Sequence, residues 1–360
     1  MKKIFVLLFL LGMVCACETE KKVSYPMVIA HRGCWLENVV PENSVAAVEM
    51  AKRYGYAGIE CDVKYTADSV MVILHDATLN RTARLADGYA KLESPVKVKD
   101  LTFEALRRDY VLASADPALR TPIPTLEELL LACRKHGMLP VLHSDLVESY
   151  TLAQEMMGDE WVAFTIHDSL LMEARKISNC LILMDPMRSK DQSAQETIKR
   201  LKRIGGKCGV SSMKRSLLTR SYCDSLRQQG FEIQSSIFQT PHEVEAVRNG
   251  VTILLTDFSL MPNTAANVLD TWSVCNQSMQ AGDVLEKRWE KQHHGGITLE
   301  LQFSGTIEVT MNEERTYTLK NPSEQGDCIG LRFLDKAPAI RIVAKEAAEL
   351  HAIKATVYQF

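Results

Sequence analysis

Residues 27–82, MVIAHRGCWLENVVPENSVAAVEMAKRYGYAGIECDVKYTADSVMVILHDATLNRT, decide the fold of this chain. Three short apolar runs in this stretch each end in polar side chains that are capable of chemistry. Short apolar runs bounded by turn residues are typical of buried strands. The runs and their following residues are Met27–Ala30 before His31-Arg32-Gly33, Ala57–Ile59 before Glu60-Cys61-Asp62, and Val70–Leu74 before His75-Asp76.

The segment between the first two runs predicts a helix. Pro41-Glu42-Asn43-Ser44 is a typical helix start, and apolar residues follow at helical spacing up to Gly55. A strand, a helix and a second strand form a parallel pair, and the sites of α/β folds lie at the carboxyl ends of such strands. The polar residues after the runs therefore mark a candidate active site.

The link between the second and third runs predicts a hairpin. The stretch from Asp62 to Val70 is too short for a crossover helix, because parallel strands need a dozen or more linking residues. Ala67-Asp68-Ser69 is then the turn, and the chain doubles back. We therefore expect His75 over the same opening as His31.

These residue types together indicate chemistry at a phosphodiester. Glu60 and Asp62 are two residues apart on a strand and therefore share a face. Two carboxylates at such a short distance repel each other and favour a hard divalent cation between them. Arg32 offers a planar fork of donors to a phosphate. His31 and His75 titrate near neutrality and can move protons.

The same stretch resembles the glycerophosphodiester phosphodiesterase family, which has a PI-PLC-like phosphodiesterase TIM barrel. The resemblance implies a divalent metal on Glu60 and Asp62, phosphate contact by Arg32, and acid–base roles for His31 and His75. Glu42 either supports Arg32 at the substrate or lies in the first turn of a helix, where negative charge is favoured in any case. The resemblance extends over residues 27–262, and its motifs are His31-Arg32-Gly33, Pro41-Glu42-Asn43-Ser44, Glu60-x-Asp62, His75-Asp76, Leu79-x-Arg81-Thr82, Ile123–Glu128 and Thr256-Asp257.

The third expected barrel strand, residues 139–146, departs from the family pattern. The family places a metal-binding Glu there and a Lys two residues later, and this chain has neither. His143 and Asp145 share a face, and we expect at least one of them to complete the site, with Asp145 preferred as the harder ligand. Ca²⁺ or Mg²⁺ suits the carboxylates, whereas a histidine ligand opens the site to a transition metal. The alternative is an incomplete metal site.

Further runs predict the rest of a barrel. Strands are expected at 139–143, 161–165, 181–184, 207–211, 232–237 and 252–255, and helices at 125–135, 146–157, 169–177, 194–204, 217–229 and 241–249. With the first two strands, and without the hairpin strand, the count is eight. Eight strands alternating with helices predict a (β/α)8 TIM barrel over residues 27–270. His167 and Asp168 follow the fourth strand and are further candidates for its mouth.

Both ends of the chain lie outside this pattern. Lys2-Lys3, an apolar run and Val14-Cys15-Ala16-Cys17 predict a lipoprotein-type signal over residues 1–17, with Cys17 lipidated and residues 18–26 as a tether. A plain signal peptide is the alternative. Period-two alternation after Gly296 predicts a small antiparallel β domain over residues 280–360, which either binds carbohydrate or other envelope material or packs against the barrel.

Composition limits the class of partner. The 360 residues carry a net charge of -3, and the absence of a basic excess argues against nucleic acid. Of the ten cysteines, the eight other than Cys15 and Cys17 include no CxxC pair, and they are expected to be small buried residues with a disulfide or two among them.

These observations predict an exported, metal-dependent phosphodiesterase that is tethered to a bacterial cell envelope. It would cleave a small glycerophosphodiester-like substrate to an alcohol and a phosphomonoester. Two alternatives stay open: a lyase that releases a cyclic phosphate, and a non-catalytic lipoprotein that binds phosphodiesters or glycans.

Overall fold

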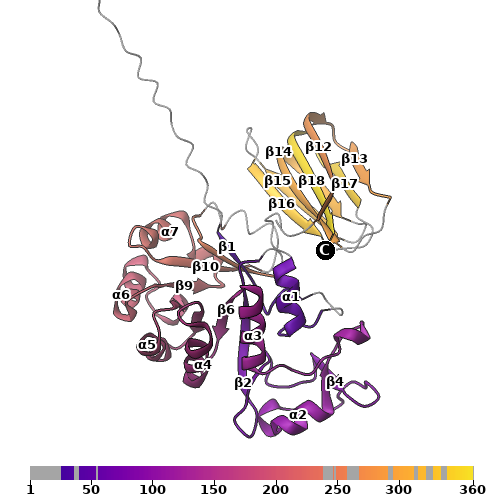
Figure 1. Ribbon diagram of the computed structural model, residues 1–360. Helices are drawn as coiled ribbons and strands as arrows, with labels where there is room; N and C mark the ends of the chain where they lie inside the picture. Colours follow the sequence, from indigo (N-terminus) through magenta and orange to yellow (C-terminus); the bar gives the residue numbers. More distant parts are fainter. Residues whose placement is uncertain are drawn as a thin grey trace, which may run out of the picture.

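Eight parallel strands close into a barrel, as the sequence predicts (Figure 1). The computed structural model describes residues 26–35, 40–53, 56–237, 246, 249–257, 267–290, 295–311, 315–321, 327–333 and 339–359. The strand β1 pairs with both β2 and β11, and these contacts complete the circle. The barrel strands are β1 (Met27–Ala30), β2 (Gly58–Tyr65), β6 (Leu139–His143), β7 (Val162–Thr165), β8 (Leu181–Met184), β9 (Cys208–Ser212), β10 (Glu232–Ile237) and β11 (Ile253–Thr256).

The strands read as continuous apolar runs because both of their faces are buried. In β1, Ile29 packs inside the barrel against Val141 and Leu255. Its neighbours Val28 and Ala30 point outward into the core between the strands and the helices. Alternate residues of β1 therefore pack in the core inside the barrel and in the core between the strands and the helices.

The outer helices lie where the sequence predicts them, to within a few residues. Thr125 and Glu128 form a reciprocal capping box at the start of α3, and Gly137 ends that helix with a left-handed φ of 61°. The predicted helix over 217–229 is shorter, because a 3-10 turn occupies Arg215–Leu217. The described helices around the barrel are α1 (Val45–Arg53), α3 (Leu126–His136), α4 (Val147–Met157), α5 (Asp168–Ile177), α6 (Ala194–Ile204) and α7 (Arg220–Arg227); the helix expected at 241–249 falls largely outside the described residues.

The predicted hairpin is present. The strand β3 (Met71–Ile73) runs antiparallel to β2, and Val63 is opposite Ile73. The segment that follows forms a small body with its own apolar core. Its short helix begins after the N-cap Thr102, whose side chain accepts a hydrogen bond from the Ala105 N–H. The elements of this body are β4 (Ala83–Leu85), η1 (Val98–Asp100), α2 (Phe103–Asp109), β5 (Tyr110–Leu112) and η2 (Pro117–Leu119).

The C-terminal strands form an antiparallel sheet, drawn in orange and yellow in Figure 1. The alternation that begins after Gly296 belongs first to one long strand, β14, which changes partners at Gly305. Gly305 has a φ of 93°, and a Cβ there would lie 2.7 Å from the Ala347 carbonyl oxygen. The strands are β12 (Asn267–Met279), β13 (Val284–Arg288), β14 (Gly295–Met311), β15 (Arg315–Asn321), β16 (Asp327–Phe333), β17 (Ala339–Ala344) and β18 (Ala348–Gln359).

The sheet begins earlier than the expected boundary at residue 280. The strand β12 pairs with β18 from Asn267 to Met279. Its sequence hides this because many of its side chains are exposed, so that its apolar alternation is weak. Pairing with β18, a strand that is distant in the sequence, places β12 in the sheet. The local sequence pattern of β12 does not show this partner.

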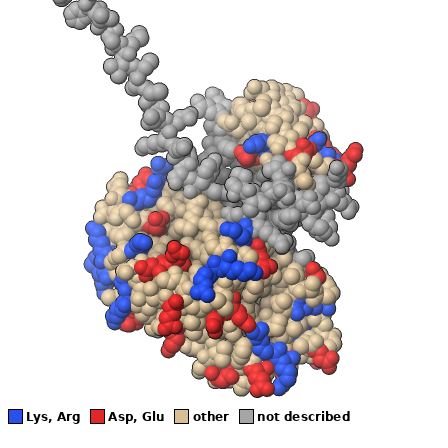
Figure 2. Space-filling model, viewed as in Figure 1, with Lys and Arg blue, Asp and Glu red and all other residues tan. Residues whose placement is uncertain are grey.

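The cysteines of the described barrel are small buried residues, as expected from the sequence. Six cysteines of the described barrel are buried: Cys34, Cys61, Cys133, Cys180, Cys208 and Cys223. On the side shown in Figure 2, basic and acidic side chains are interspersed over the described barrel surface. No helix in the described part of the chain is long and apolar enough to cross a membrane.

We predict that Gly58→Ala destabilises the barrel strongly. A Cβ on Gly58 would lie 2.2 Å from the Leu139 carbonyl oxygen and 2.9 Å from Cδ1 of Ile29. Because these atoms belong to the two neighbouring strands, the pairing must shift, at a cost of about 3 kcal/mol. Denaturant unfolding followed by far-ultraviolet circular dichroism would measure this cost.

Gly88→Ala is the matched control. Gly88 has a φ of 66° and no atom within 4 Å of its hypothetical Cβ. Only backbone strain opposes that change, at about 1 kcal/mol. Equal losses for the two variants would contradict the steric explanation.

Candidate active site

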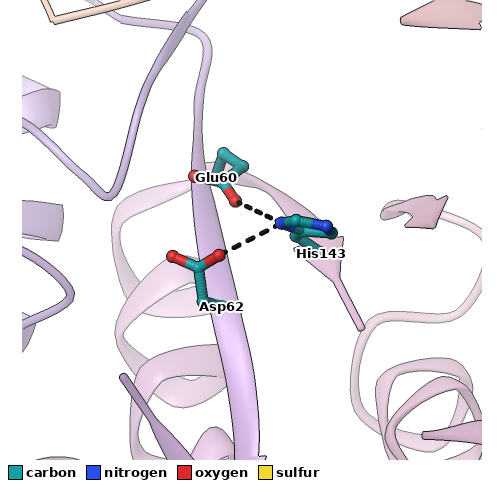
Figure 3. A group of neighbouring side chains, drawn as sticks. All are labelled: Glu60, Asp62 and His143. Carbon is teal, nitrogen blue, oxygen red and sulfur yellow. Dashed lines mark hydrogen bonds and ion pairs between the residues drawn. The ribbon is translucent and has the colours of Figure 1, made fainter. Parts of the chain in front are cut away.

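Two buried carboxylates and a histidine meet at the carboxyl end of the barrel (Figure 3). Glu60 and Asp62 lie on β2, and each is only 3% exposed. His143 ends β6, and the parallel register places it beside Asp62. The Nδ1 atom of His143 lies 3.1 Å from Oδ1 of Asp62 and 3.9 Å from Oε1 of Glu60. The ligand atoms of the three residues lie within 4.8 Å of one another.

A left-handed turn after β1 brings Arg32 to these carboxylates. Arg32 and Gly33 have φ angles of 57° and 77°. A Cβ on Gly33 would lie 2.6 Å from Cβ of Ala47, so only glycine fits beside α1. The turn directs the backbone N–H of Arg32 to Oε2 of Glu60, at 3.1 Å. Strain in the backbone thus serves to place a donor on a buried carboxylate.

The guanidinium of Arg32 lies between two carboxylates. Its Nη1 donates to Oε1 of Glu42 at 3.1 Å, and its Nε lies 3.7 Å from Oδ2 of Asp62. Nε is buried, and no hydrogen-bond partner for it is found among the described residues. A buried donor without a partner is costly, so this atom is well suited to an incoming oxygen ligand.

The electrostatics of the two carboxylates favour a cation. Burial and the negative charge of Asp62 raise the pKa of Glu60 well above its ordinary value. Burial also acts to raise the pKa of Asp62, but hydrogen bonds and charge from His143, with a hydrogen bond from Asn43, lower it to about 2. Two buried carboxylates with a nearby imidazole therefore fit a divalent cation, whose charge would offset the repulsion between them.

Each of the predicted catalytic histidines is held by a carboxylate. The Nδ1 atom of His31 lies 2.9 Å from Oδ1 of Asp257, which follows β11, and its Nε2 lies 3.9 Å from Oε2 of Glu60. The Nδ1 atom of His75 lies 2.7 Å from Oδ1 of Asp76. A carboxylate on Nδ1 fixes the orientation of each ring and leaves Nε2 as the nitrogen that exchanges protons.

Arg81 connects Asp76, which holds the second histidine, to Glu42, which holds Arg32. It donates to both oxygens of Asp76 and to both oxygens of Glu42. The hydrogen bonds from Arg81 and His75 lower the pKa of Asp76 to about 2. The pKa of Glu42 is also lowered, because Arg81 and Arg32 outweigh the effect of burial. Glu42 therefore stays ionised and positions Arg32, as one of its two predicted roles requires.

The structure groups His143, and not the preferred Asp145, with the two carboxylates. Asp145 accepts a hydrogen bond from Thr165, lies 3.8 Å from Nε2 of His167 and has a side chain that is 58% exposed. It follows the end of β6, where the chain no longer alternates as a strand. The other two candidates do not join the carboxylates either, since Asp168 pairs with Arg200 and His167 faces Asp145.

Three residues of the site were given no role from the sequence. Asp257 lies in a motif after the last strand, and only the closure of the barrel brings it to His31. Asn43 donates to Oδ2 of Asp62 at 3.0 Å, and its own N–H donates to the Arg32 carbonyl at 2.8 Å. Arg81 is the third. Their motifs were visible, but their partners lie far away in sequence.

Comparison with known proteins agrees with this geometry. Residues 31–167 match the glycerophosphoryl diester phosphodiesterase family. The matched segment contains Arg32, Glu60, Asp62, His75 and His143, so the part of the chain that carries the candidate site is similar to that family. Glycerophosphodiester phosphodiesterase 1 of Bos taurus is 32% identical over 177 residues, which are 46% of each protein. A glycerophosphodiester phosphodiesterase of Bacillus altitudinis is 31% identical over 150 residues, 41% of this chain and 57% of that protein.

The chain spans about half the length of the curated relatives that it matches. A solved structure covers more of this chain. The phosphodiesterase of Oleispira antarctica, in complex with the product sn-glycerol-3-phosphate, aligns with a TM-score of 0.52 at 19% identity. That alignment covers 67% of this chain and 95% of the other, and it shows that the two share the barrel fold.

We predict that His143, and not Asp145, contributes to metal affinity. His143→Ala removes a ligand atom from the buried carboxylates and should weaken binding of a divalent cation by at least about 10-fold. Asp145→Asn is the matched control, because the carboxylate that it removes faces Thr165 instead. Isothermal titration of Mn²⁺ and of Mg²⁺ into the wild-type protein and each variant would measure the change in affinity that each substitution causes. An equal loss for Asp145→Asn would mean that Asp145 also ligates.

Proposed function

We propose that this protein is a metal-dependent glycerophosphodiester phosphodiesterase, which hydrolyses its substrate to an alcohol and a phosphomonoester. The observation that carries the proposal is the convergence of Glu60, Asp62 and His143 with two oriented histidines at one mouth of the barrel. The family match and the names of the relatives support the same activity.

The residues divide into positioning and proton-transferring groups. Arg32, with its buried Nε and its Nη1 held by Glu42, is placed to donate to a phosphate oxygen. His31 and His75 are the acid–base pair: one accepts the proton of the attacking water, and the other protonates the departing alcohol. Asp257 and Asp76 keep the two rings oriented throughout.

Glu60, Asp62 and His143 would hold the divalent cation, which, when bound, stabilises negative charge on the phosphate oxygens. Two carboxylates suit Ca²⁺ or Mg²⁺. The imidazole of His143 is a softer ligand and extends the range to metals such as Mn²⁺ or Zn²⁺. We propose that the mixed ligand set makes this site more permissive than one built from carboxylates alone.

Turnover of a glycerophosphodiester tests the proposal. The protein without residues 1–17 should release sn-glycerol-3-phosphate, and a chelator should abolish the reaction. His31→Ala and His75→Ala should each lower kcat by roughly 100-fold or more, the scale of general acid–base catalysis. His136→Ala, on the outer end of α3, is the control and should keep wild-type turnover.

Phosphorus NMR of the product mixture distinguishes the alternatives. A cyclic phosphate as the end product would replace hydrolysis with a lyase reaction. Binding of the substrate without any turnover, at every divalent metal tried, would contradict an enzymatic role and leave a binding protein.

We also propose that the protein is anchored to the bacterial cell envelope through a lipid on Cys17. This proposal rests on the sequence Val14-Cys15-Ala16-Cys17 after an apolar run. Cys17→Ala should move the protein from the membrane fraction to the soluble fraction and abolish incorporation of a labelled fatty acid. Cys15→Ala is the matched control. Membrane association that survives Cys17→Ala would contradict the lipid anchor.

A further inference from the structure

A pocket of about 330 Å³ adjoins the carboxylates and shares His143 with them. It lies between the outer end of the β2–β3 hairpin, the η1 turn and the segment after β6. Its volume is at the lower end of the range for small-molecule sites, roughly 300–1,000 Å³. Because His143 belongs to both, the pocket lies directly beside the group of ligand atoms.

Three lysines give the pocket its chemical character. Lys64, Lys97 and Lys99 line it, and Asp145 is the single acidic residue among those that do. None of the three ammonium groups has an ion pair or hydrogen bond in the described part of the chain, whereas Asp145 already faces Thr165 and His167. This excess of positive charge stands in a chain whose net charge is -3.

The backbone that carries two of these lysines is fixed beside a catalytic histidine. Val98, between Lys97 and Lys99, is 3% exposed and anchors the turn in an apolar core. Its N–H donates to the carbonyl of Ala77 at 3.1 Å, and Lys97 forms a β-bridge with Thr78. Ala77 follows His75-Asp76 directly, so the positions of the lysines are tied to that of His75.

We propose that this pocket binds the departing alcohol of the substrate and selects alcohols that carry a second anionic group, a carboxylate or a phosphate. The inference rests on the proposed phosphodiesterase activity and names the substrate class within it. An anionic substituent would be attracted by three ammonium groups that have no partner in the described ranges. A neutral alcohol would gain nothing from them, and a purely cationic one would be repelled.

A matched pair of substrates tests the proposal. Glycerophosphoserine and glycerophosphoethanolamine differ by one carboxylate on the alcohol. We expect a higher kcat/KM for the serine compound, and a ratio between the two that decreases as salt screens the lysines. Glycerophosphoinositol with and without a phosphate on its ring forms a second pair, and it distinguishes recognition of a phosphate from recognition of a carboxylate.

Substitution of the lysines locates the effect. Lys97→Met/Lys99→Met should lower the serine-to-ethanolamine ratio by roughly 5-fold, because each exposed charge contributes a modest factor. The corresponding double arginine variant should restore the preference. Lys91→Met, on an exposed lysine of the same segment that does not line the pocket, should keep the wild-type ratio.

The outcomes separate the two proposals. Turnover of both compounds with no preference for the anionic one, or with a preference that survives the double methionine variant, would overturn the pocket inference and leave the phosphodiesterase activity intact. No turnover of any compound would overturn the proposed activity. Calorimetric binding of the same pair to the His75→Gln protein tests the pocket without turnover: tighter binding of the serine compound supports it, and equal binding refutes it.

Discussion

The structure of this site depends on two carboxylates that are buried two residues apart on one strand. Glu60 and Asp62 leave the same face of β2, and neither has enough solvent to disperse its charge. Their neighbours compensate in part. The backbone N–H of Arg32, the amide of Asn43 and the imidazole of His143 all point at these oxygens. These contacts do not fully offset the repulsion between the two carboxylates. The site therefore favours binding of a cation.

That compensation determines the local backbone. Arg32 and Asn43 both have left-handed φ angles, and a hydrogen bond from the Asn43 N–H to the Arg32 carbonyl joins the two residues. Gly33 is required because any Cβ would strike Ala47 at the start of α1. The turn after β1 therefore adopts a strained backbone that directs hydrogen-bond donors to the carboxylates on β2. The packing of α1 against Gly33 holds this turn in place.

The two histidines lie on different elements but are oriented in the same way. Asp257 reaches His31 because β1 and β11 are neighbours in the closed barrel, and Asp76 reaches His75 within one segment. Arg81 and Glu42 then connect Asp76 to Arg32, so that the hairpin and the turn after β1 form one network of charged hydrogen bonds. A change in the hairpin therefore alters the turn after β1, and the reverse, since Glu42 accepts hydrogen bonds from both Arg81 and Arg32.

The sequence by itself determined the barrel, its eight strands and the site residues on β1, β2 and the hairpin, because these depend on local patterns: apolar runs, helix caps, turn residues and period-two alternation. Only the tertiary structure decided which distant groups complete the site. Parallel register between β2 and β6 placed His143, and not Asp145, at the carboxylates. Closure of the barrel brought Asp257 to His31, and pairing with β18 drew β12 into the C-terminal sheet. Each of these contacts joins residues that are tens to hundreds of positions apart. The stabilising energy of these contacts comes from a partner strand that is distant in the sequence. The pattern of neighbouring residues therefore does not predict them.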